Sequence, residues 1–85
     1  MAGTLDIFRA LADEVRLRVL HALLSAELSV AELVDVLKLP QSTVSRHLKV
    51  LADAGWVIAR EDGTSNRYRH DGRVLEAGAR RLWAS

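Results

Sequence analysis

The stretch "LPQSTVSRHLKVLADAG", residues Leu39 to Gly55, has the pattern of a helix with two unlike faces. At 100° per residue, Val44, Leu48 and Leu51 fall together on one side. The opposite side carries short hydroxyls and long cations, namely Ser42, Ser45, Arg46 and Lys49. We therefore expect the apolar face to join a core and the polar face to meet a partner. The alternative is a solvated helix face, because any surface helix carries polar residues.

A second helix precedes this one closely. The run "SVAE" has the form of a capping box, in which Ser29 caps the helix and Glu32 reaches back. The expected buried face of that helix is Val30, Leu33, Val34 and Leu37. Pro40 suits a first helical turn, where its missing amide hydrogen is not needed, and Gly55 ends the following helix. Two helices joined by a short turn, the second polar on its outer face, predict a helix-turn-helix.

The rest of the chain supplies helices on both sides and a hairpin. Helices are expected over residues 5–12, over 15–24 with Asp13 as N-cap, and over 73–85. After Gly55, "WVIARED" and "NRYRH" flank the turn "DGTS" and predict two strands. The sequence thus indicates a mainly α fold with a small β-hairpin, a winged helix-turn-helix of order α-α-α-α-β-β-α, in a single domain over residues 1–85.

Composition limits the classes of protein that this chain can belong to. Its 85 residues are 49% apolar, as in one small globular domain, and the absence of cysteine excludes disulfides and thiolate metal sites. The first residues do not form a signal peptide, and no apolar run is long enough for a membrane span, so we expect a cytoplasmic protein. The net charge of +1 is too small to indicate a partner. Residues 41–70, however, hold five Lys or Arg against three Asp or Glu. The rest of the chain has a smaller excess of positive charge or none.

Residues Phe8 to His70 resemble the DNA-binding domain of the ArsR/SmtB family of small dimeric bacterial repressors. The resemblance rests on "FRALADEVRLRVLHALL", "LSVAELVDVLKLPQSTVSRHLKVLADAGWV" and the hairpin "IAREDGTSNRYRH", with "STVSRHLKVLADAGWV" the most distinctive part. It implies a transcriptional repressor that binds a palindromic site on double-stranded DNA as a homodimer.

The polar face of the helix at residues 41–53 is the predicted DNA-reading surface. Arginine can read guanine edges in the major groove, while lysine and hydroxyl side chains hold phosphates. The predicted contacts are Gln41, Ser42, Thr43, Ser45, Arg46 and Lys49. His47 lies beside the apolar stripe and is expected to pack or to hydrogen-bond locally, although the resemblance keeps it as a second-rank DNA contact.

The hairpin is predicted to add cations that lie along the DNA backbone or enter the minor groove. Its predicted contacts are Arg60, Thr64, Arg67 and Arg69. Tyr68 alternates with the arginines and is expected to pack its ring under the hairpin. The alternative is a surface hairpin without a ligand, in which Glu61 and Asp62 cancel the local charge.

The chain departs from the resembled family in its metal ligands. Members that sense arsenic, cadmium or lead carry cysteines in a run like "ELCVCDL", whereas this chain has "ELSVAEL", with Ser29 and Ala31 at those places. Other members bind zinc through the last helices, where this chain offers only His70, Asp71 and Glu76. We predict no metal site and no cofactor, and the sequence does not identify an inducer.

In the resembled family the first and last helices form the dimer interface, so the resemblance implies that residues 5–12 and 73–85 form one here. The wide apolar face of the last helix, which a small monomer would have trouble covering, favours the same interface. The predicted interface is Leu5, Phe8, Leu11, Leu75, Ala79, Leu82 and Trp83. The alternative is that the last helix folds back on its own core. Two other functions remain open: a winged-helix module that binds protein, and the front end of a longer regulator. An enzyme is not expected, because the sequence has no nucleophile with a base, no paired carboxylates and no phosphate loop.

Overall fold

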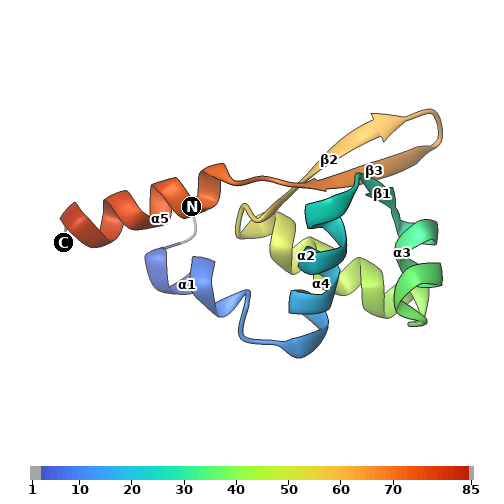
Figure 1. Ribbon diagram of the computed structural model, residues 1–85, viewed down its shortest axis with the longest axis horizontal. Coiled ribbons are helices and arrows are strands. Elements are labelled where there is room, and N and C mark those ends of the chain that lie inside the picture. Colours follow the sequence, from blue (N-terminus) through green and yellow to red (C-terminus); the bar gives the residue numbers. More distant parts are fainter. Residues whose placement is uncertain (1–2, 85) are drawn as a thin grey trace.

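The computed structural model describes the backbone of residues 3–84 and the side chains of residues 3–76, 79 and 80. Five helices and three strands follow one another over this part of the chain: α1 (Thr4–Arg9), α2 (Glu14–Ser25), β1 (Leu28–Ser29), α3 (Val30–Leu37), α4 (Gln41–Asp53), β2 (Val57–Asp62), β3 (Ser65–His70) and α5 (Arg73–Ala84). The predicted order of helices and hairpin is confirmed, and β1 is an addition. Figure 1 shows α5 extending at one end of the molecule and the β2–β3 hairpin at the other.

The helix-turn-helix consists of α3 and α4, and its ends are built as the sequence indicated. Ser29 Oγ accepts from the Glu32 amide at 3.1 Å, and Glu32 Oε1 accepts from the Ser29 amide at 2.9 Å. Helix α3 ends at Lys38, which has a left-handed backbone with φ 56°, and α4 begins directly after Pro40. Gly55, with φ 89°, follows α4 in a conformation that L side chains rarely adopt.

Three antiparallel strands form the sheet, in the order β1-β3-β2. Strands β2 and β3 join through Gly63 and Thr64, and the positive φ of Gly63 suits a tight two-residue hairpin turn. The short strand β1 pairs with the free edge of β3, placing Leu28 opposite Tyr68 and Ser29 opposite Arg67. The sequence did not reveal β1, because two residues are too few to show an alternating pattern.

The core lies where α2, α3 and α4 meet the base of the hairpin. It contains the predicted stripe of α4, Val44, Leu48 and Leu51, together with Ile7, Val19, Leu23, Leu33, Trp56 and Val74 among others. In α2 the buried residues are Val19, Leu20 and Leu23, whereas Leu17 and Leu24 are exposed. The helical spacing of Leu17, Leu20 and Leu24 therefore marks a face that only partly coincides with the buried one.

Helix α1 is shorter than the sequence predicted. It ends at Arg9 instead of Ala12, and a turn then leads to Asp13, whose side chain caps α2 by accepting from the amides of Val15 and Arg16. Ile7 and Ala10 face the core, while Leu5 is exposed. Within the described residues, no helix combines the length and the apolar character that crossing a membrane requires.

Candidate nucleic-acid interface

One face of α4 is a row of exposed polar side chains. Gln41, Ser42, Ser45, Arg46 and Lys49 are all exposed, and Thr43 is half-buried. They lie opposite the buried stripe, as the periodicity predicted, so they are free to meet a partner. The only ion pair on this row, among the described side chains, joins Lys49 Nζ to Asp53 Oδ2 at 3.4 Å. Arg46 thus presents an uncompensated cation near the middle of the helix.

His47 does not belong to this row. Its side chain is only 6% exposed, and its Nδ1 lies 3.4 Å from Nη1 of Arg16 on α2. The burial of the ring and its contact with Arg16 argue against the second-rank DNA contact assigned to His47, which stays a prediction. The local packing that the helical wheel favoured is confirmed.

A groove of about 390 Å³ joins the start of α4 to the hairpin. Its lining includes Ser29 at the start of α3, Gln41 at the start of α4, and Thr64, Ser65 and Asn66 at the hairpin tip. Tyr68 also lines it, and the half-buried ring packs against the core as predicted. The groove therefore brings Gln41 and Thr64, two of the predicted contacts, to one surface, although 23 residues separate them in sequence.

Two of the three hairpin arginines are engaged within the protein. Arg60 donates from Nε to Glu27 Oε1 at 3.2 Å, and Arg67 donates from Nη2 to the Glu27 carbonyl oxygen at 2.9 Å. Arg67 Nη1 also lies 3.0 Å from Glu32 Oε1. Among the described side chains, neither Glu61 nor Asp62 forms an ion pair with these arginines, although the charge of Asp62 helps to raise the pKa of Arg60. Arg69 is exposed, and within the described part of the chain it forms no ion pair.

Glu27 is the site residue that sequence reasoning missed. The hydrogen bond from Arg60 is the main cause that lowers the pKa of its carboxyl, and the nearby charges of Arg60 and Arg67 act in the same direction. No local signal could have found it, because 33 and 40 residues separate Glu27 from these partners. The pairing depends on β1 bringing residue 27 alongside β3.

The terminal helices α1 and α5 pack together and leave apolar side chains exposed. Leu5, Leu75 and Ala79 are exposed, while Phe8 and Leu11 are half-buried. Phe8 is partly used inside the subunit, because its ring meets Trp56 edge-on with centroids 6.1 Å apart. The side chains of Leu82 and Trp83 lie outside the described residues, so the predicted interface stays a prediction.

The start of α5 does not offer a free set of metal ligands. Asp71 is bonded to Arg73 through Oδ1 at 2.9 Å and Oδ2 at 2.7 Å. These hydrogen bonds lower the pKa of the Asp71 carboxyl to about 2. Across the side chains that the structure describes, no group of three His, Cys, Asp or Glu could hold a metal ion.

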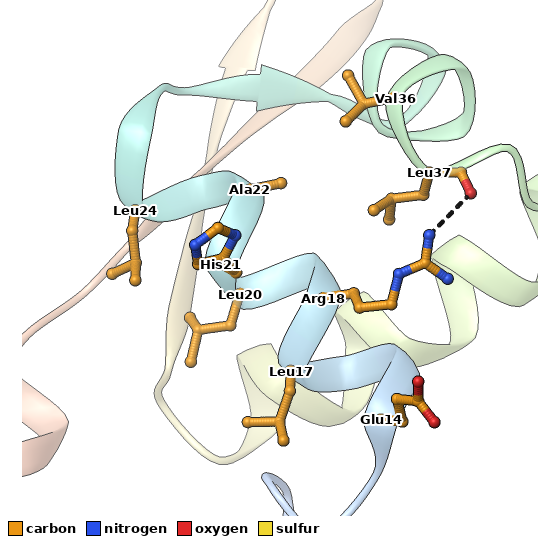
Figure 2. Close-up of a pocket in the computed structure, with 9 residues that line it drawn as sticks. All are labelled: Glu14, Leu17, Arg18, Leu20, His21, Ala22, Leu24, Val36 and Leu37. Carbon is orange, nitrogen blue, oxygen red and sulfur yellow. Dashed lines mark hydrogen bonds between the residues drawn. The ribbon is translucent and has the colours of Figure 1, made fainter.

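A second groove, of about 600 Å³, lies between α2 and α3 (Figure 2). The exposed apolar residues Leu17, Leu24 and Val36 contribute to its lining. Arg18 crosses toward α3 and donates to the Leu37 carbonyl oxygen at 3.3 Å. All of the lining residues come from α2 and α3, so this groove is separate from the row on α4 and from the hairpin.

Residues 13–59 match the family model of bacterial regulatory proteins of the arsR family. The matched residues run from the cap of α2 through the helix-turn-helix into β2 and make up more than half of the chain. The chain belongs to the ArsR family. An HTH-type transcriptional regulator of Methanocaldococcus jannaschii is 44% identical over 64 residues, which cover 74% of this chain and 72% of the relative.

Solved structures agree with this ArsR-family membership. An ArsR-like transcriptional regulator from Rhodococcus is 32% identical with a TM-score of 0.84, and the match covers 95% of this chain and 76% of that one. The homodimeric winged helix-turn-helix DNA-binding domain of a Mycobacterium bovis protein is 30% identical with a TM-score of 0.76, covering 93% and 74%. The fold is therefore an ArsR-like winged helix.

Other curated ArsR-type relatives are longer than this chain, which spans about half the length of three of them. Several relatives are named as repressors of resistance operons, and one is named as a transcriptional activator.

Proposed function

We propose that this chain is a DNA-binding domain that regulates transcription by binding a specific site on double-stranded DNA as a homodimer. The observation that carries the proposal is the row of exposed polar side chains on α4, directly opposite its buried stripe and continuous with the hairpin tip. An α-helix fits the major groove, where such side chains can reach base edges and phosphates. Membership of the ArsR family supports the same role.

Within this surface, the roles follow from side-chain chemistry. Arg46 is the candidate for reading a base, because its guanidinium is exposed and can make a paired contact with guanine. The proposed phosphate contacts are Gln41, Ser42, Thr43, Ser45 and Lys49 on α4, and Thr64 and Arg69 on the hairpin. We leave His47 out of the proposed contacts because it is buried.

The dimer proposed here uses the outer faces of α1 and α5. Leu5, Leu75 and Ala79 are exposed there, and the homodimeric domain from Mycobacterium bovis has the same fold. We include Leu82 and Trp83 on the strength of the sequence pattern. A two-fold dimer would present its two α4 helices to successive major grooves, about 34 to 36 Å apart, and so would bind a palindromic site.

The proposed activity is binding without catalysis, in a single domain over residues 1–85. Ser45 is exposed and His47 is buried, so these two residues do not form a nucleophile and base. Relatives named as repressors support repression as the mode of action. DNA binding implies a site of action in the cytoplasm, where bacterial DNA is held.

A salt series of fluorescence-anisotropy titrations tests the proposal. The two ligands are duplex DNA from the region upstream of the coding sequence and a scrambled duplex of the same length and composition. We expect tight, salt-sensitive binding with a clear preference for the upstream sequence. Weak binding, or equal binding to both duplexes, would overturn the proposal and favour a winged-helix module that binds protein.

A further inference from the structure

Glu27 lies between α2 and β1, where it contacts the outer face of the hairpin. Arg60 and Arg67 form a cross-strand pair, so their side chains share one face of the β2–β3 ribbon. Ser29 belongs to the same face through its pairing with Arg67, whereas Ala59, Tyr68 and Leu28 belong to the opposite, core-facing side. Glu27 therefore meets the two arginines on the side of the sheet that faces away from the core.

The two arginines are held to different degrees. The side chain of Arg67 is 27% exposed and has three partners: the Glu27 carbonyl oxygen, the Glu27 carboxylate and the Glu32 carboxylate. The side chain of Arg60 is 55% exposed, and within the described residues its only ion-pair partner is Glu27. Loss of the Glu27 charge would leave Arg67 attached through Glu32 and the carbonyl, but it would release Arg60.

A released arginine on a hairpin beside DNA would bind phosphate. Phosphate contacts supply nearly all of the nonspecific affinity of DNA-binding proteins, and each one steepens the dependence of binding on salt. Such a contact forms on every sequence, so it strengthens binding to correct and incorrect sites by the same factor.

We propose that Glu27 limits the nonspecific DNA affinity of this domain by holding the Arg60 guanidinium in an ion pair and so keeping its charge from the phosphates. This inference rests on the DNA-binding function proposed above. It gives Glu27 the role of a positioning residue that limits affinity for DNA of any sequence, with Arg60 as the cation it restrains and Arg67 as the anchor of the hairpin.

Glu27→Gln tests the inference, because glutamine keeps the size of the side chain and removes its charge. In the anisotropy salt series with scrambled duplex, the slope of log K against log salt should steepen by about 0.9 for each subunit bound. Affinity for the upstream and the scrambled duplex should rise by the same factor, because a phosphate contact forms on both. Glu14→Gln is the matched control, since it makes the same change of residue and charge at an exposed position on α2 that forms no ion pair among the described side chains. It should leave the slope unchanged.

Two further variants identify the released cation. Glu27→Gln combined with Arg60→Gln should return the slope to the wild-type value, and persistence of the steeper slope would overturn the role given to Arg60. Arg60→Gln alone does not depend on the folding of a Glu27 variant. It should lose clearly less than the 0.9 per subunit that a free phosphate-binding cation loses, and a full loss would overturn the inference.

The outcomes separate this inference from the proposed function. Wild-type protein that binds DNA, with a Glu27→Gln variant of unchanged slope, would overturn only the role of Glu27. Wild-type protein that binds neither duplex would overturn both proposals.

Discussion

The indole Nε1 of Trp56 donates a hydrogen bond to the carbonyl oxygen of Ile7, 2.6 Å away and 49 residues earlier in the chain. The Trp56 amide donates to the Leu51 carbonyl oxygen at the end of α4, and its carbonyl oxygen accepts from the Asp71 amide before α5. Trp56 thus forms hydrogen bonds with α1, with the end of the helix-turn-helix and with the residues that lead into α5. Trp56 therefore links the proposed dimer helices to the proposed recognition helix by hydrogen bonds, in addition to the shared apolar core.

Trp56→Phe should lower the free energy of unfolding by about 1 to 3 kcal/mol, because it leaves the buried Ile7 carbonyl oxygen without its donor. Trp56→Ala should cost more, about 3 to 5 kcal/mol, since it also opens a cavity in the core. Urea denaturation followed by far-UV circular dichroism measures both values. A Phe variant as stable as the wild type would show that the hydrogen bond makes no net contribution to the free energy of unfolding.

Arg46→Ala should lower the affinity for the upstream duplex by about 1 to 3 kcal/mol and relax sequence preference, because Arg46 is the proposed base-reading residue. Lys49→Ala should instead weaken binding to upstream and scrambled duplexes alike and reduce the salt slope by about 1. Arg80→Gln is the control, as an exposed cation on α5 that is paired with Glu76. If Arg46→Ala binds like this control, Arg46 is not a DNA contact.

Leu75→Lys should dissociate the proposed dimer, because it places a charge in the centre of an apolar contact between subunits. Val36→Lys is the matched control: Leu75 and Val36 are 51% and 58% exposed, but Val36 lies in the groove between α2 and α3. Sedimentation velocity at tens of micromolar should show a monomer for the first variant and a dimer for the second. The reverse result would move the interface to the α2–α3 groove.

Acidification should remove a stabilising contribution from Asp71. Its hydrogen bonds from Arg73 lower the carboxyl pKa in the folded state from 3.8 to about 2, so the folded protein favours the charged form. The contribution is complete above the unfolded pKa and is lost as the pH falls from about 4 toward 2.

Urea midpoints measured between pH 5 and pH 2 check this expectation. Asp71→Asn should flatten the decline over that interval, while Asp35→Asn, at an exposed position paired with Lys38, serves as the comparison. A decline of equal steepness in the Asp71 variant and the wild type would contradict the assignment.

The amino-acid sequence by itself determined the helix-turn-helix and the polar face of α4. The capping box joins Ser29 to Glu32 across three residues, and Gly55 ends α4 through its own backbone conformation. The spacing of Val44, Leu48 and Leu51 reports which side of α4 is buried. These signals act within a few residues or one helical period, so they can be read without knowledge of the neighbouring elements.

Only the tertiary structure decided which partners meet across the fold. In α2, the side that carries Val19 and Leu23 is buried, whereas Leu17 and Leu24 are exposed, because burial depends on where neighbouring elements pack. The tertiary structure also brought Glu27 to Arg60, so a residue that the sequence predicted to contact DNA forms an ion pair within the protein. Both outcomes depend on contacts between residues far apart in sequence, and such contacts leave no periodic or local trace in the chain.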